Sequence, residues 1–532
     1  MPALSVRSLA LSVGLALALG AGGLAAPASA QVTAFKQAVA ENAARDEDIA
    51  AYYRSTKFDH LWTGPDDRAR LEALLTALSE SDDHGLPAAK YDPDALMAKL
   101  ADAKTPRERG ALDVEISRVF LSYARDLQTG ILTPAKVDGD IVRKVPYRDR
   151  VSYLENLAKS TPRAFFRALV PQHPEYARLM REKMRLEQVL GQGGWGPTVP
   201  GALKPGASGQ AVVALRNRLA AMGYMGHSAS ASYDADLQKA VQLFQMDHGL
   251  EADGVAGAGT IAAINTPPEE RLKSIIVAME RERWFNRERG ARHILVNLTD
   301  FTARIVDHGK VTFETRSVIG HTDRDRRSPE FSDVMDHMVI NPSWNVPRSI
   351  TTKEYLPLLR RNPNAVGHLQ VVDSRGRTVS RGAVNFSRYN ARNFPYRLRQ
   401  PPSRGNALGL VKFMFPNKYN IYLHDTPAKH LFSRETRAYS HGCIRLADPF
   451  EFAYALLAKQ ESDPKGFFQS KLRTGAETRV DLVDPVPVHL IYRTAYTTAK
   501  GRINYRRDIY GRDGRIFDAL AREGVALRAV QG

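Results

Sequence analysis

The chain has a single cysteine, Cys443, among 532 residues, and beyond its first 30 residues it has no long uninterrupted apolar run. One cysteine excludes an internal disulfide, so Cys443 is either a buried spectator or a free thiol kept for chemistry. Without a run of about 20 apolar residues, no membrane-spanning helix is predicted there. Proline and glycine are dispersed, which excludes collagen-like and low-complexity tracts.

The first 30 residues differ from the rest. Arg7 is followed by an apolar stretch over 9–24 and by the small residues 28–30, Ala-Ser-Ala. This pattern predicts a secretory signal peptide, residues 1–30, cleaved near Ala30. An N-terminal membrane anchor is the alternative, but the stretch is short and rich in alanine and glycine, which favours a signal.

The formal net charge is +17. A basic exported protein suits an acidic polymer as partner. Nucleic acid is the usual alternative, but export argues against it. Solubility alone is the simplest reading of the charge.

The predicted organisation is multidomain α+β. Residues 31–190 carry apolar residues at helical spacing, for example Leu71, Leu74 and Leu78, and are predicted to form a helical scaffold. A glycine-rich linker follows. Residues 203–266 are predicted to form three short helices, two of which stop at glycines.

From residue 291 the apolar period changes to two, as in Ile294, Val296 and Leu298, which predicts a mostly β domain over 291–512. Residues 348–405 interrupt it; from 375 to 404 they hold eight arginines and no lysine. Because arginine matches carboxylates with a planar fork, this insertion is predicted to be a lid, or else a solvated insertion. Residues 513–532 are assigned as a C-terminal tail.

The densest chemical signal surrounds the cysteine. His424 follows Tyr422 at the end of a predicted strand, and Cys443 follows Ser440-His441-Gly442. A free thiol, with a pKa of ~8.5, needs a base or a positive neighbour to become a nucleophile. The Gly442 and Cys443 amides are candidates to face a developing oxyanion. A buried cysteine near histidines, or a zinc site, is the alternative.

This pattern resembles the L,D-transpeptidase (YkuD-like) catalytic domain: a His, a spacer, then Ser/Thr-His-Gly-Cys and an Arg. Further similarities lie at 341–347, 406–413 and 508–511. Residues 203–266 resemble the peptidoglycan-binding-domain-1 family. With the scaffold and the insertion, the chain is similar to the large Gram-negative subtype that has a capping subdomain.

The resemblance implies a cysteine acyltransferase. Cys443 would attack the carbonyl between meso-diaminopimelate and D-Ala of a tetrapeptide stem, D-Ala would leave, and the amine of a second stem would resolve the thioester into a 3→3 cross-link. His424 would act as general base and then acid. The other implied site residues are Gly442, Ser440, Asp425 and Tyr422 for the oxyanion and for orienting His424, and Arg445, His441, Trp344 and Asn345 for the substrate.

The same resemblance implies peptidoglycan as partner, the periplasm as location, and acylation by carbapenem-type inhibitors. It implies no cofactor, no metal, no nucleic acid and no membrane span in the mature chain. Water, a free D-amino acid or an outer-membrane protein are alternative acceptors. A wall-binding scaffold without activity is the non-enzymatic alternative. Either Asp425 or Ser440 is expected to orient His424.

Overall fold

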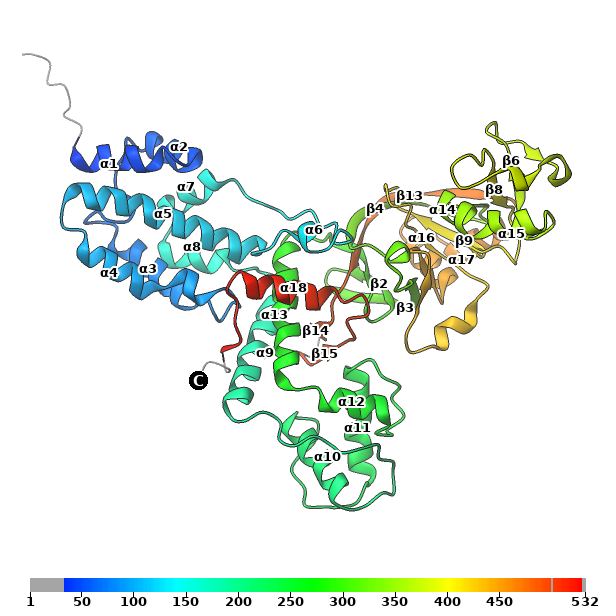
Figure 1. Ribbon diagram of the computed structural model, residues 1–532, viewed down its shortest axis with the longest axis horizontal. Coiled ribbons are helices and arrows are strands. Elements are labelled where there is room, and N and C mark those ends of the chain that lie inside the picture. Colours follow the sequence, from blue (N-terminus) through cyan, green and yellow to red (C-terminus); the bar gives the residue numbers. More distant parts are fainter. Residues whose placement is uncertain (1–32, 499–500, 529–532) are drawn as a thin grey trace, which may run out of the picture.

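The computed structural model describes residues 33–498 and 501–528. A helical region, a small three-helix unit and a β-rich region lie at separate corners of the molecule (Figure 1). The predicted signal peptide, residues 1–30, lies outside the described residues. Within the described ranges, no helix is long and apolar enough to cross a membrane.

The helical region is built around α5 (Pro106–Thr129), its longest helix. Thr105 and Glu108 form a capping box at its start, Pro106 occupies the first turn, and the helix ends at Gly130. The other helices are α1 (Ala34–Ala43), α2 (Glu47–Ser55), α3 (Arg68–Ser79), α4 (Pro93–Asp102), α6 (Pro134–Val137), α7 (Arg150–Lys159), α8 (Pro162–Leu169) and α9 (Pro174–Gly191).

Two helices from later in the chain complete this region. The helix α13 (Pro268–Trp284) packs along α9, and α18 (Arg512–Arg522) packs against α13. Ile516 and Leu520 of α18 are fully buried in the same hydrophobic core as Phe120 of α5. Much of the segment that the sequence assigns to a tail is therefore an amphipathic helix.

The three-helix unit consists of α10 (Gln210–Ala221), α11 (Ala235–Asp247) and α12 (Ala258–Asn265), as predicted. Leu215, Leu237 and Phe244 lie in its own core. The helix α11 contacts the short strand β15 (Ile503–Tyr505), and Tyr505 of this strand belongs to the core of the helical region.

The β-rich region contains a nine-stranded sheet in the order β11-β3-β12-β10-β9-β4-β13-β1-β2, which closes because β2 also pairs with β3. Its strands are β1 (Arg292–Asn297), β2 (Thr302–Asp307), β3 (Lys310–Gly320), β4 (Phe331–Ile340), β9 (Val411–Met414), β10 (Leu423–His424), β11 (Ala438–Ser440), β12 (Ile444–Leu446) and β13 (Thr478–Ile491). Helices α16 (Pro449–Leu457) and α17 (Pro464–Arg473) follow β12, and β14 (Ala495–Thr497) pairs with β15. The predicted mostly β domain is confirmed.

The insertion is more ordered than the sequence predicts. It has its own core and a second sheet in the order β5-β8-β6-β7. Its elements are β5 (Trp344–Asn345), α14 (Arg348–Ile350), a π-helical turn (Thr351–Tyr355), α15 (Leu356–Arg361), β6 (Gln370–Val372), β7 (Thr378–Val379) and β8 (Arg397–Gln400). Arg381 donates to the main-chain carbonyls of Ala365 and Val366 at 2.8 Å, so it fastens a loop rather than facing a ligand.

Candidate active site

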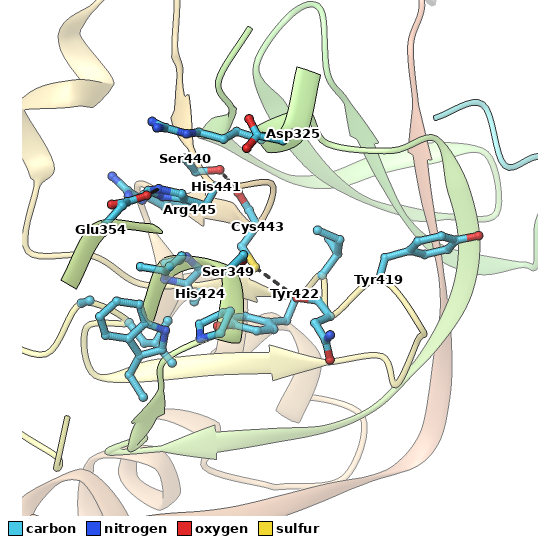
Figure 2. Close-up of a pocket in the computed structure, with 18 of the residues that line it drawn as sticks. Asp325, Ser349, Glu354, Tyr419, Tyr422, His424, Ser440, His441, Cys443 and Arg445 are labelled. Carbon is cyan, nitrogen blue, oxygen red and sulfur yellow. Dashed lines mark hydrogen bonds and ion pairs between the residues drawn. The ribbon is translucent and has the colours of Figure 1, made fainter. Parts of the chain in front are cut away.

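A pocket of about 470 Å³ brings the cysteine and its neighbours together with the insertion. Figure 2 shows Cys443 pointing into it, with His424 and Tyr422 on one side and Ser440, His441 and Arg445 on the other. Of the sequence-predicted site residues, those that line the pocket are Trp344, Tyr422, His424, Ser440, His441, Cys443 and Arg445.

The sheet positions the two reactive side chains. Strand β10 pairs in parallel with β12, so that Leu423 lies opposite Ile444 and His424 opposite Arg445. Because Cys443 directly precedes β12, this register brings the thiol and the imidazole to the same end of neighbouring strands. In the sequence a long loop lies between the two residues, and the pairing of the strands brings them close together.

The orienting group for His424 is a main-chain atom. The Nδ1 atom of His424 lies 2.5 Å from the carbonyl oxygen of Asp425. Since a carbonyl only accepts, Nδ1 carries the hydrogen and Nε2 is left as the proton acceptor. This corrects the expectation that the side chain of Asp425 or Ser440 orients the ring.

The side chains of Asp425 and Ser440, which were expected to orient His424, form other hydrogen bonds. The Asp425 carboxylate accepts from the amides of Leu410 and Thr426, at 2.9 and 2.7 Å. Gly409, with φ +61°, leaves room for it, because a Cβ there would lie 2.2 Å from its Oδ2. The Ser440 hydroxyl donates to the Cys443 carbonyl at 2.5 Å. Both side chains therefore stabilise the main chain around the site instead of orienting His424.

The loop before the cysteine is tied down through main-chain groups. Gly442 has φ +111°, a conformation that favours glycine, and its amide donates to the Ser440 hydroxyl at 3.1 Å. The buried Ser328 hydroxyl donates to the Gly442 carbonyl at 2.6 Å. The Gly442 amide is thus occupied and does not face the pocket, contrary to the expected oxyanion role. Across the described part of the chain, the Cys443 amide has no recorded acceptor.

Burial keeps both reactive groups neutral at rest. It raises the pKa of the Cys443 thiol to about 11, although Tyr422 and the Arg445 cation favour the thiolate. Burial first, and then the Arg445 cation, lower the pKa of His424 to about 3. The thiol donates to the carbonyl of Asn420 at 3.4 Å.

The side chains of His441 and Arg445 differ in their pairing at the pocket. The Nε2 atom of His441 lies 2.6 Å from the Glu354 carboxylate, so it links the catalytic loop to the insertion. Arg445 is half-buried, and within the described ranges its Nε has no hydrogen-bond partner. Arg445 lines the pocket, but its unpartnered Nε is buried from solvent.

Asn345 does not lie in the pocket, where the sequence predicts it. Trp344 lines the pocket, but its neighbour Asn345 is exposed and does not. Successive residues of a strand face opposite sides, so β5 can turn only one of them inward.

Several pocket or loop residues carry no local sequence signal. Lys353 and Glu354 reach the pocket from the insertion, and Lys353 pairs with Asp325 at 2.7 Å. Ser328 and Asn420 form hydrogen bonds with Gly442 and Cys443, which are distant from them in the sequence. Only Asn420 has a hint, because asparagine favours the left-handed conformation (φ +54°) that it adopts. The described residues contain no cluster of three or more His, Cys, Asp or Glu suited to a metal.

Three regions of the chain, which correspond to the three parts of the fold, match known protein domains. Residues 291–482 match the sequence model of the L,D-transpeptidase catalytic domain, residues 208–264 that of the "Putative peptidoglycan binding domain", and residues 47–182 that of the scaffold domain. The β-rich region is thus similar to the L,D-transpeptidase catalytic (YkuD) domain, and the other two regions are similar to the peptidoglycan-binding and scaffold domains.

A Haemophilus influenzae protein described as "Putative L,D-transpeptidase" is 33% identical over 228 residues, which are 42% of this chain and 45% of that protein. The match thus spans less than half of the relative. Crystal structures of L,D-transpeptidases from Xylanimonas cellulosilytica and Stackebrandtia nassauensis are 15% and 16% identical and each match 56% of this chain. They are covered to 100% and 97%, with TM-scores of 0.16 and 0.22.

Proposed function

We propose that this chain is a peptidoglycan L,D-transpeptidase that forms 3→3 cross-links through a thioester on Cys443. The observation that carries the proposal is the placement of the only cysteine and a buried, tautomer-fixed histidine at one pocket, within a domain of this catalytic family. The peptidoglycan-binding domain supports the polymer as substrate, and polymer-acting domains support an extracytoplasmic location, here the periplasm.

In the first half-reaction the Cys443 sulfur attacks the stem carbonyl while Nε2 of His424 removes the thiol proton. The C–N bond to D-Ala then breaks, and His424 returns the proton to the departing amine. In the second half-reaction His424 takes a proton from the acceptor amine, the amine attacks the thioester, and the thiol leaves with that proton. Concerted proton transfer suits two groups that are both neutral at rest.

The remaining roles follow from position. The Cys443 amide and the Tyr422 hydroxyl stabilise the oxyanion, Arg445 binds a stem carboxylate, and Trp344 forms a wall of the donor site. His441 acts through its link to the insertion rather than by touching the reacting atoms. Carbapenem-type inhibitors would acylate Cys443 by the same attack.

Mass spectrometry of protein and products tests the proposal. Protein lacking residues 1–30 is incubated with a disaccharide-tetrapeptide, beside Cys443→Ala and the exposed control Ser470→Ala. We expect an acyl adduct on Cys443 and a dimer lacking one D-Ala, both lost only in Cys443→Ala. Tripeptide without dimer would indicate hydrolysis, and a product attached to protein would indicate anchoring. Neither an adduct nor any product would refute the proposal.

A further inference from the structure

A second cleft, of about 370 Å³, lies where the three-helix unit meets the β-rich region. It is lined by the 249–251 turn after α11, the 299–301 turn between β1 and β2, the segment 433–437, and residues 506–507 after β15. It shares no lining residue with the Cys443 pocket. The segment 433–437 nevertheless leads directly into β11 and the loop that carries Cys443.

The two domains are in direct contact at this cleft. Gly249 has φ +64°, and a Cβ there would lie 2.7 Å from Cδ of Arg506, so this arginine packs on the glycine backbone. Arg506 also donates to the main-chain carbonyl of Asp247 at 2.8 Å. Arg502 pairs with the Asp247 carboxylate at 2.6 Å. A ligand in the cleft would therefore touch both domains at once.

The cleft has more positive than negative charge. Its arginines are Arg316, Arg434, Arg437, Arg506 and Arg507. Within residues 33–498 and 501–528, only Arg507 forms an ion pair, with Glu435 at 2.8 Å.

The acidic groups of the cleft do not balance the other four arginines. The Asp300 carboxylate is buried and is already bound by Arg304 at 3.0 Å and by the Thr302 hydroxyl at 2.6 Å. Glu251 is exposed on the turn at the opposite wall, and no ion pair to it is recorded within the described ranges. Unpaired guanidinium groups around a cleft attract an anion.

Like charges crowd one wall. Arg437 donates only to main-chain carbonyls, including those of Phe301 and Ser317, both at 3.2 Å. Burial and the neighbouring Arg316 lower the pKa of Arg437 to about 10. Arg316 and Arg434 are exposed on the same wall and keep donors for a ligand.

We propose that this cleft binds a stem-peptide carboxylate of a peptidoglycan strand that is not undergoing reaction, and so holds the polymer across the binding and catalytic domains. The proposal rests on the proposed function for its ligand. A carboxylate fits because the planar guanidinium fork donates two parallel hydrogen bonds to it, and because the 249–251 turn belongs to the region that matches the peptidoglycan-binding domain.

Binding to isolated sacculi tests the proposal. The full chain in a Cys443→Ala background is compared with the same chain carrying Arg316→Ala and Arg434→Ala. The matched control carries Arg163→Ala and Arg167→Ala, which remove two exposed arginines from α8. We expect the cleft variant to bind about tenfold more weakly, equivalent to ~1.4 kcal/mol, and the control to bind like the parent. Unchanged thermal unfolding would show that both variants fold.

Chemical modification of the sacculi identifies the ligand group. Sacculi with amidated carboxylates should bind the parent as weakly as the cleft variant, and amidation should not weaken the variant further. Equal binding of parent and cleft variant to unmodified sacculi would overturn the proposal. The proposal would also be overturned if the cleft variant bound more weakly than the parent by the same factor on amidated and on unmodified sacculi. A third contrary result would be release of the parent from sacculi by inorganic phosphate at concentrations where acetate has no effect.

A separate readout keeps this proposal distinct from the catalytic one. With Cys443 restored, the cleft variant should still release D-Ala from a soluble disaccharide-tetrapeptide at the parental rate, because the cleft lies outside the reaction pocket. Equal losses of release and of sacculus binding would overturn a separate site. Failure of the parent itself to release D-Ala would contradict only the transpeptidase, since sacculus binding is measured without turnover.

Discussion

Two buried clusters of ionisable groups in this molecule behave in opposite ways. At the Cys443 pocket, burial raises the pKa of the thiol and lowers that of His424, so both are neutral. At the junction of α13, β4 and α18, burial lowers the pKa of Arg281, but Glu330 and Asp513 outweigh it and raise that pKa above its usual value. Burial raises the pKa of Asp513 to about 6, and Arg281 opposes this rise.

Pairing explains the difference. Arg281 of α13 lies 2.6 Å from Glu330 and 2.9 Å from Asp513 of α18. Arg512 also binds Glu330, at 3.2 Å. At the Cys443 pocket the charged neighbour is Arg445, which favours the thiolate but does not outweigh burial of the thiol, and which disfavours the imidazolium of His424. Burial favours the neutral form of a group, whereas a hydrogen-bonded counter-charge favours its charged form, and the balance of the two sets the direction of the pKa shift.

The largest expected effect is at the neutral cluster. His424→Ala should lower the transpeptidation rate by roughly 10²–10⁴-fold, because the thiol loses its base. In the free enzyme, alkylation of Cys443 by iodoacetamide should rise only as the pH approaches about 11, where the thiolate forms. Rapid alkylation at pH 5–7 that His424→Ala abolishes would instead indicate a thiolate–imidazolium pair and would break the comparison.

The charged cluster should be sensitive to the loss of one partner. Arg281→Met leaves the Asp513 carboxylate buried without its cation, and we expect it to reduce the free energy of unfolding by ~3–5 kcal/mol. The control Arg68→Ala removes a solvent-exposed pair with Glu72, and we expect it to leave the stability nearly unchanged. Denaturant unfolding measures both. Similar stabilities for the two variants would mean that the junction charges are not coupled.

A pH series sharpens the same point at Glu282. Burial by itself would raise its pKa, but Arg493 and Arg289 override this and lower it to about 2. A carboxylate with a lowered pKa stabilises the fold above its unfolded pKa of about 4.3, and this stabilisation is lost as the pH falls towards 2. Glu282→Gln should therefore cost ~3 kcal/mol at pH 7 and progressively less below pH 4. A cost that does not vary with pH would show that Glu282 is not ionised.

The smallest effect is expected at the pocket rim, where His441 and Glu354 form a solvent-exposed contact. Glu354→Gln breaks the link between His441 and the insertion, a pair worth at most ~1 kcal/mol. We expect KM for the donor to change less than about fivefold and kcat to stay constant. Arg377→Gln, which breaks another exposed pair within the insertion, is the control. A large fall in kcat for Glu354→Gln alone would place Glu354 in the chemistry.

The motif residues were predictable because their relation is local or periodic. Ser440, Gly442 and Cys443 are covalent near-neighbours, and the alternation of apolar residues predicts the sheet that brings His424 to them. The helical region and the three-helix unit follow from helical periodicity in the same way. The ordered insertion was missed because its core forms between short segments with no clear period.

The sequence by itself determined the fold class, the resemblance to a catalytic family and the choice of Cys443 and His424 as the candidate reactive pair. Only the tertiary structure decided that a main-chain carbonyl orients His424, that the Gly442 amide is occupied, and that Asn345 faces away from the pocket. It also decided that Glu280, Arg281, Glu282 and Arg283, which look like a solvated stretch, are buried. Their partners lie up to 232 residues away, and the cost of burying a charge depends on what the fold places beside it.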